Sequence, residues 1–317
     1  MVLFIGHSSA VRLLRSLEDF EGIRAARAMP SSRDIPTLPK SFRESSPLAT
    51  LPRPLEVVVS SGKTRSQAKQ FHSNIWKLPD RTSCFLLFEN GIYLSNPEFC
   101  FVQLARSCSV IDLIKLGFEL CGTYRMDSSS SIGFQSAQPL SSPEAISRFI
   151  DKIPGKAPRK AKTAVRYVRS GSASPMETCL ALLLGLPASY GGYGLGMPEM
   201  NAKVLIPAKY GKRATYREYH CDLYWPERNV AIEYNSREFH VNELAVERDA
   251  SRINNLKAAG IEVLAVTRAH VADNKKFDAI AHSAASLMGK RIRVAYADID
   301  ERRADLRKQL FSKDPWC

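Results

Sequence analysis

The sequence predicts an α/β protein in which a mixed β-sheet is flanked by helices, preceded by a smaller α+β domain. Residues 219–235 read as two short strands joined by the polar turn Pro226–Asn229. Residues 261–267 form a nearly continuous apolar run, typical of a strand buried on both faces. Between these segments, Asn242 caps a predicted helix that Gly260 ends. A strand, a helix and a strand in this order predict a right-handed crossover within a mixed sheet.

The upstream domain is predicted from two strands and three helix signals. The expected strands are 55–60 and 84–88, and a turn at Asn90-Gly91 leads into a hairpin arm at 92–94. Asn96 followed by Pro97 predicts a helix start, and apolar residues continue the helical region through 110–120. A further amphipathic helix is expected to begin at Ser142. Residues 1–50 predict only a short helix near 10–21, followed by loop.

The downstream domain begins at Ser174-Pro175, which predicts a helix running to Gly185. A strand near 204–206, a helix from about 275 to 288 and a charge-rich, exposed helix in the tail complete the prediction. We therefore divide the chain into five parts. They are a poorly defined segment (1–50), an α+β accessory domain (51–153), a basic linker (154–173), the main α/β domain (174–290) and a charged tail (291–317).

Composition limits the class of protein. With 317 residues, 44% of them hydrophobic and 24% charged, the chain has enough apolar material for two globular domains. No apolar run reaches transmembrane length, and the apolar start of the chain is too short for a signal peptide, so we expect no membrane and a cytoplasmic location. Seven scattered cysteines without a Cys-x-x-Cys pair favour small core residues over a zinc site or disulfide framework.

The formal charge of +13 favours a polyanionic partner, most simply nucleic acid, although solubility alone also explains a high charge. Seven basic residues and no acid fall within residues 152–169. A solvated linker is one interpretation of this strip. The other is a phosphate-contacting surface that uses Lys160, Lys162, Arg166 and Arg169.

Two carboxylates form the central feature of the candidate site. A hairpin centred on the turn at 226–229 pairs Asp222 with Glu233, on one face of the sheet and with Cβ atoms about 5 Å apart. Two like charges so placed destabilise a sheet, and a divalent cation such as Mg²⁺ removes the repulsion. The same alternation places Asn235 on the face of Glu233. The alternative is an ordinary hairpin with one wet face.

Four nearby residues have both a structural and a functional interpretation. Glu177 stands three residues after Ser174, as in a capping box. His240 is either an ordinary histidine or a group that orients or deprotonates water. Arg248 and Arg252 lie one turn apart on the predicted helix, where they either contact phosphate or pair with neighbouring acids.

At these residues the chain resembles the PD-(D/E)xK nuclease superfamily, in particular the branch similar to very-short-patch-repair endonucleases. The resemblance covers roughly residues 174–272 and implies a restriction-endonuclease-like core. It rests on an ordered set of residues: Glu177, Asp222, Glu233-Tyr-Asn235, His240, Arg248-Asp-Ala-Ser-Arg252, Gly260 and Ile261–Thr267. It implies that Asp222 and Glu233, joined by Glu177, hold Mg²⁺ or Mn²⁺. Asn235 replaces the Lys or Asp-Gly of the family and brings no charge to the site.

A second resemblance concerns residues 55–125, which look like the effector portion of AbiEi-type antitoxins. Two functions follow as hypotheses. The first is a metal-dependent endonuclease acting on nucleic acid, most simply DNA. The second is a catalytically weakened protein of nuclease fold that binds nucleic acid or neutralises a toxin partner.

Overall fold

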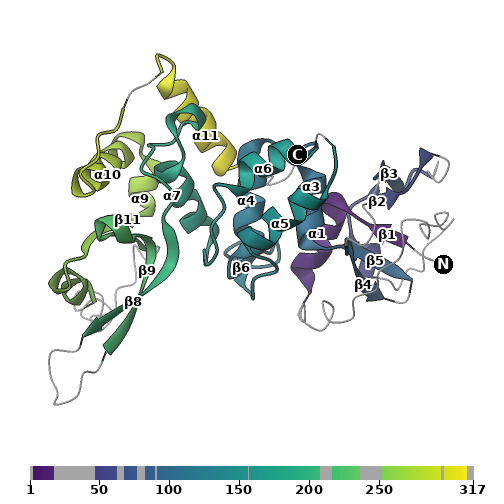
Figure 1. Cartoon of the computed structure of the whole chain (residues 1–317), viewed down its shortest axis with the longest axis horizontal. Coiled ribbons are helices and arrows are strands. Elements are labelled where there is room, and N and C mark those ends of the chain that lie inside the picture. The colour runs from purple at the N-terminus through teal and green to yellow at the C-terminus, as the bar shows by residue number, and fades with distance from the viewer. Residues whose placement is uncertain are drawn as a thin grey trace.

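The computed structural model describes residues 3–17, 47–62, 68–76, 83–89, 91–155, 157–207, 216–235, 252–293 and 296–312. Two β-sheets lie toward opposite ends of an elongated molecule, and a group of helices lies between them (Figure 1). The molecule is therefore a mixed α/β protein with helices beside mixed sheets, as expected.

The sheet near the N-terminus has five strands in the order β3-β2-β1-β5-β4. The strands are β1 (Leu3–Ile5), β2 (Leu55–Val59), β3 (Phe71–Ile75), β4 (Phe85–Glu89) and β5 (Ile92–Ser95). The strands predicted from 55, 84 and 92 onward are confirmed, and β4 and β5 form the predicted antiparallel hairpin.

The division at residue 50 is wrong for the first residues of the chain. Strand β1 is the middle strand of this sheet, antiparallel to β2 and parallel to β5, and each of its residues is at most 1% exposed. Helix α1 (His7–Ser16) follows it and contacts β2 and the helix after β5. Three consecutive apolar residues were too short a run to be recognised as a strand, because only pairing with two distant strands makes them one.

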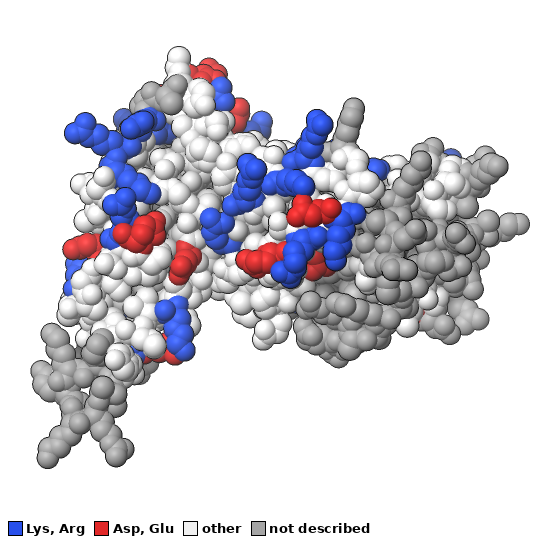
Figure 2. Space-filling view, viewed as in Figure 1, with Lys and Arg blue, Asp and Glu red and all other residues white. Residues whose placement is uncertain are grey.

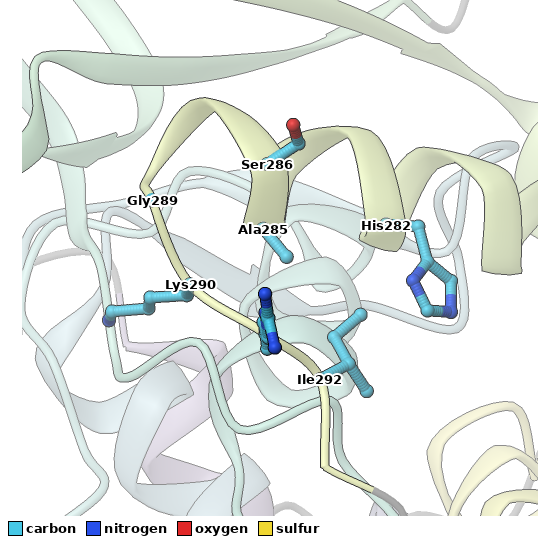
Figure 3. A pocket seen from close by; sticks show the side chains of 7 residues that line it. His282, Ala285, Ser286, Gly289, Lys290 and Ile292 are labelled. Carbon is cyan, nitrogen blue, oxygen red and sulfur yellow. The ribbon is translucent and has the colours of Figure 1, made fainter.

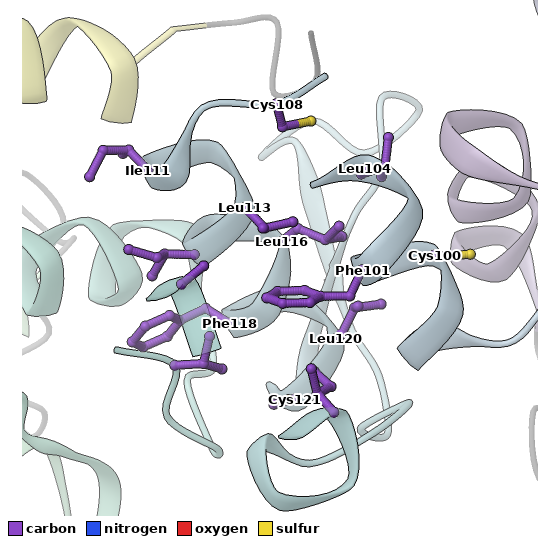
Figure 4. Packing of buried hydrophobic residues seen from close by; sticks show 14 of the residues in the cluster. Cys100, Phe101, Leu104, Cys108, Ile111, Leu113, Leu116, Phe118, Leu120 and Cys121 are labelled. Carbon is purple, nitrogen blue, oxygen red and sulfur yellow. The ribbon is translucent and has the colours of Figure 1, made fainter. Parts of the chain in front are cut away.

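Helices α3 (Pro97–Leu104) and α5 (Pro143–Lys152) start where the sequence predicts, whereas the helical region expected to continue through 110–120 is a separate helix, α4 (Val110–Cys121). A polar side chain caps each one, so that an otherwise free backbone amide has an acceptor. Most of the side chains labelled in Figure 4 come from α3 and α4. Short strands β6 (Tyr124–Met126) and β7 (Phe134–Ser136) pair beside α4.

The expected basic linker is instead largely a packed helix. Residues Ala157–Val165 form α6, whose Ala161 and Ala164 are fully buried against the central helices. The approach is close at Gly117 of α4, where a Cβ atom would stand 2.4 Å from Cγ2 of Val168. The density of charge concealed an apolar stripe of small residues, which is why the sequence suggested a solvated strip.

The second sheet has the order β11-β10-β9-β8. Helix α7 (Pro175–Gly185) precedes β8 (Glu199–Pro207), β9 (Tyr216–Trp225) and β10 (Val230–Asn235). A helical segment, 252–258, leads into β11 (Glu262–Thr267), which is parallel to β10 as predicted. The prediction that this strand is buried on both faces is wrong, because β11 is an edge strand in which Val266 alone is buried. Helices α9 (Arg268–Ala272) and α10 (Asn274–Leu287) follow β11. The described residues also include short 3₁₀ helices at η1 (Pro47–Thr50), η3 (Ala188–Tyr190) and η4 (Pro226–Arg228).

The charged tail is a helix, as predicted, but it is only partly exposed. Helix α11 (Ile299–Leu310) buries Leu306 and Leu310 and contacts α4, α7 and η3. Lys115 of α4 donates a hydrogen bond of 2.7 Å to the carbonyl of Gln309, while Arg307 donates to the carbonyl of Val271 in α9. Helix α11 therefore connects the central helices to the second sheet.

The described residues bear on the cysteines and on membrane-spanning helices. Six cysteines lie there, and all six are buried thiols without a disulfide. None of the helices described combines the length and apolar character needed to cross a bilayer.

Candidate functional site

The hairpin of β9 and β10 has the predicted register. Val230 pairs with Trp225, and Ile232 pairs with Leu223, and the ladder ends one position before Asp222 and Glu233. Asn229 closes the turn with a φ of 50°, a left-handed conformation that asparagine tolerates better than most residues.

Asp222 is held by the backbone of the neighbouring strand. Its Oδ2 accepts a hydrogen bond of 2.7 Å from the amide of Tyr234. Burial raises the pKa of Asp222, while this hydrogen bond and the charge of Arg252 act against the increase. The carboxylate is thus fixed in place without being neutralised by a partner of its own.

Glu233 is more strongly perturbed. It is 7% exposed, and its Oε2 accepts from Nη2 of Arg252, which also donates to the carbonyl of His220 at 2.9 Å. Its Oε1 is buried and makes no hydrogen bond of ordinary geometry with the described residues, although the Cys221 thiol is close enough to act against the rise in the pKa of Glu233. Burial raises the pKa of Glu233 to about 7, and the charge of Asp222 adds to the increase against the opposing effect of Arg252. The wet face of the alternative interpretation is therefore not present at Glu233.

Arg252 makes a contact that its helix position did not suggest. It pairs with Glu233 on β10, and its Nη2 is committed to the protein. A guanidinium engaged in this way orients one carboxylate oxygen. No local pattern pointed to this pair, because the two residues are nineteen positions apart.

Glu177 lies near the pair, but its carboxylate is already used. Oε1 accepts from the hydroxyl of Ser174 at 3.0 Å, and Oε2 accepts from the amide of Ala173 at 2.9 Å and from Nδ2 of Asn201 at 2.6 Å. Burial raises the pKa of Glu177, and the charge of Asp222 contributes to the increase. The capping interpretation therefore accounts for both oxygens, with the return bond made one residue before the cap.

Asn201 was not recognised from the sequence. It lies in β8, and the pairs on either side of it in the ladder place it opposite Asp222. Its φ of 47° interrupts the strand, and its Nδ2 joins Glu177 to the carbonyl of Gly171. It lies before the strand predicted near 204–206, so no sequence signal pointed to it.

Of the three other residues predicted around the pair, the structure describes Asn235 alone. Asn235 is exposed and pairs with Thr267 of β11. His220 is exposed and contacts Glu218 with its ring at 3.0 Å, away from Glu233. His240, Arg248 and the capping Asn242 lie in residues 236–251, outside the described part of the chain.

Most of the basic side chains predicted to contact phosphate instead contact other groups of the protein. Lys160 donates to the carbonyl of Cys108 at 2.8 Å, Lys162 pairs with Asp151 at 2.8 Å, and Arg169 donates to the carbonyls of Arg166 and Val168. On the face shown in Figure 2, basic and acidic side chains are mixed over the central helices. Arg166 is exposed, as is Arg159 seven positions before it.

A pocket of about 530 Å³ lies elsewhere, at the C-terminal end of α10 (Figure 3). Its lining includes His282, Lys290 and Arg291 and none of the acidic residues. Lys290 donates to the carbonyl of Leu195, which ties this end of the helix to the preceding loop. The pocket and the carboxylate pair are therefore separate features.

The resemblance implies a divalent cation at the carboxylate pair. Asp222 and Glu233 supply hard oxygen donors, and the Oε1 of Glu233, without a hydrogen bond of ordinary geometry in the described structure, is the kind of buried atom that a cation satisfies. Glu177 does not fit as a third donor, because its oxygens are occupied. Across the described ranges, no three His, Cys, Asp or Glu side chains form a group able to hold a metal ion. Two carboxylates, those of Asp222 and Glu233, therefore suit a divalent cation.

Comparisons with protein-family models, with curated proteins and with solved structures each returned no match.

Proposed function

We propose that residues 174–290 form a metal-dependent endonuclease that hydrolyses phosphodiester bonds of DNA. The observation that carries the proposal is the pair Asp222 and Glu233, two acids on adjacent strands whose pKa values are both raised by burial. A fold gains no stability from such a pair by itself, and perturbed acids of this kind are found most often at functional sites.

The order of the elements supports the proposal. An acid on a first helix, an aspartate and a glutamate on consecutive strands, a helix and then an apolar strand follow one another as they do in the family pattern. Glu177 lies near Asp222, although it serves the helix cap.

Asp222 and Glu233 would hold the Mg²⁺ or Mn²⁺ ion, which when bound would polarise the scissile phosphate and increase the acidity of water. The chain's own groups keep these carboxylates in position. The amide of Tyr234 fixes Asp222, and Arg252 fixes one oxygen of Glu233. Such supporting contacts are what make a site precise.

Cleavage and metal binding test the proposal together. Plasmid and single-stranded DNA are incubated with Mg²⁺ or Mn²⁺ and the native chain, Asp222→Asn or Glu233→Gln. We expect cleavage by the native chain only, and weaker binding of Mn²⁺ by both variants in calorimetry. Glu227→Gln is the matched control, because Glu227 is an exposed acid on the turn of the same hairpin. Equal cleavage by all four proteins would rule the site out.

A second candidate function is a nuclease-fold protein that binds nucleic acid or a toxin partner without cutting. Two observations favour it: Asn235 stands where the family has a charged group, and Arg252 already provides a positive charge to Glu233. A native chain that binds DNA but neither binds Mn²⁺ nor cleaves would select this function. A neighbouring gene for a nucleotidyltransferase-like toxin would favour the antitoxin form of it.

A further inference from the structure

Strands β8 and β9 extend beyond the rest of their sheet. Strand β9 pairs with β10 only through residues 223–225, whereas its ladder with β8 continues out to the pair of Pro207 and Tyr216. The five residues from 216 to 220 thus form a two-stranded ribbon roughly 15 Å long. Figure 1 shows these outer parts of β8 and β9 reaching away from the helices.

The two faces of this ribbon differ in character. One face carries Ile206, Tyr219 and Cys221, which pack with Leu256 of the helical segment 252–258. The other face carries Leu205 and Tyr216, which are 56% and 61% exposed and are among the most exposed large apolar side chains described. Apolar side chains placed together at the end of a protruding element are typical of an interaction surface.

The charge carried by the ribbon favours a polyanion. Lys203 lies on the face of Leu205, where it pairs with Glu218, and Arg217 is exposed on the opposite face. In the sequence, the eight residues that join the two strands contain three basic side chains and no acid. A second copy of this chain would bring the same positive charge against itself, which disfavours self-association through the ribbon.

We propose that the β8–β9 ribbon enters the major groove of double-stranded DNA, with Leu205 and Tyr216 against the bases. The inference rests on the proposed function in taking DNA as the partner. The major groove admits a two-stranded ribbon, and apolar side chains contact thymine methyl groups there.

The base of the ribbon is tied to the carboxylate pair. Arg252 donates both to Glu233 and to the carbonyl of His220, and Nδ2 of Asn255 donates to the hydroxyl of Tyr219 at 2.9 Å. These bonds fix the ribbon relative to Asp222 and Glu233.

The test is duplex binding in EDTA, where cleavage by a metal-dependent enzyme does not occur. Binding of a fluorescein-labelled duplex is followed by anisotropy at several salt concentrations. We expect the double variant Leu205→Ser, Tyr216→Ser to bind about tenfold more weakly. Its dependence of log affinity on log salt stays that of the native chain, because no charge has changed. Both side chains are exposed, and urea unfolding checks that the variant stays folded.

The matched control is Ile132→Ser, which removes an apolar side chain that is 69% exposed between β6 and β7. Its affinity should equal that of the native chain. Equal affinity of the native chain and the double variant, an equal loss in Ile132→Ser, or no binding by the native chain would each overturn the inference. A change of oligomeric state without a change of affinity would also overturn it, in favour of self-association.

Failure of the ribbon and failure of the nuclease give different results. Ribbon-dependent binding without cleavage in Mg²⁺ removes the nuclease and supports the ribbon. Cleavage by a native chain whose affinity does not depend on Leu205 and Tyr216 removes the ribbon alone.

Discussion

Two buried glutamates in this molecule each pair with an arginine, and the difference between them separates a structural ion pair from a candidate site. Glu119 of α4 meets Arg15 through two hydrogen bonds of 2.7 Å, and its Oε1 also accepts from the amide of Met126 at 3.0 Å. Glu233 of β10 has one oxygen on Arg252 and the other without a hydrogen bond of ordinary geometry in the described structure.

Burial alone does not distinguish Glu119 from Glu233, but the partners of their carboxylate oxygens do. The two residues are similarly covered, at 5% and 7% exposure. Glu119 has a partner for each oxygen, so its pair holds α1 to α4. Glu233 has a second acid beside it and an oxygen without such a hydrogen bond, so its environment suits an additional positive charge.

Removal of Glu119 should have the largest effect on stability. Glu119→Ala removes both hydrogen bonds to Arg15 and the acceptor of the Met126 amide, and should lower the free energy of unfolding by about 3 kcal/mol. Urea denaturation followed by circular dichroism measures this loss. Glu233→Gln should lose much less, and an equal loss would mean that both pairs are structural.

The pH dependence of stability should reveal Glu233. Its pKa rises from 4.5 to about 7 on folding, so the folded protein holds this proton more tightly than the unfolded chain. The resulting stability is present below pH 4.5 and is lost as the pH rises through 7, by up to about 1.4 kcal/mol for each pH unit. Without metal, Glu233→Gln should therefore gain stability relative to the native chain between pH 5 and pH 8. A difference that stays constant with pH would contradict this account.

The two arginines should respond differently to a conservative change. Arg15 uses Nε and Nη2 on separate oxygens, and lysine cannot reproduce both bonds, so Arg15→Lys should cost about 1–2 kcal/mol. Arg252 uses Nη2 alone and is 34% exposed, so Arg252→Lys should cost less. Denaturation of both variants under one condition ranks the costs, and the reverse order would refute the distinction.

Glu177 should give the smallest effect. Glu177→Gln keeps an oxygen that accepts from Ala173 or Asn201, so we expect a loss of about 1 kcal/mol or less. DNA cleavage should persist, in contrast to Glu233→Gln, because Glu177 serves the helix cap. Loss of cleavage with native stability would instead return Glu177 to the metal site.

Signals from residues close together in the chain predicted several helix starts and the hairpin that carries Asp222 and Glu233. Caps at Asn96, Ser142 and Ser174 act within one helical turn, so their positions could be found from neighbouring residues. The turn at 226–229 fixed the register of β9 and β10, and with it the juxtaposition of Asp222 and Glu233.

Contacts between segments that are far apart in the chain were decided only by the tertiary structure. Strand β1 becomes the centre of a sheet because β2 and β5 pair with it, and α6 and α11 become buried because α4 approaches both. The sequence by itself determined where turns, caps and the acidic pair lie, since these depend on residues close in the chain. It did not determine which oxygens Arg252 and Asn201 would occupy, because a side chain's partner depends on how separate elements pack.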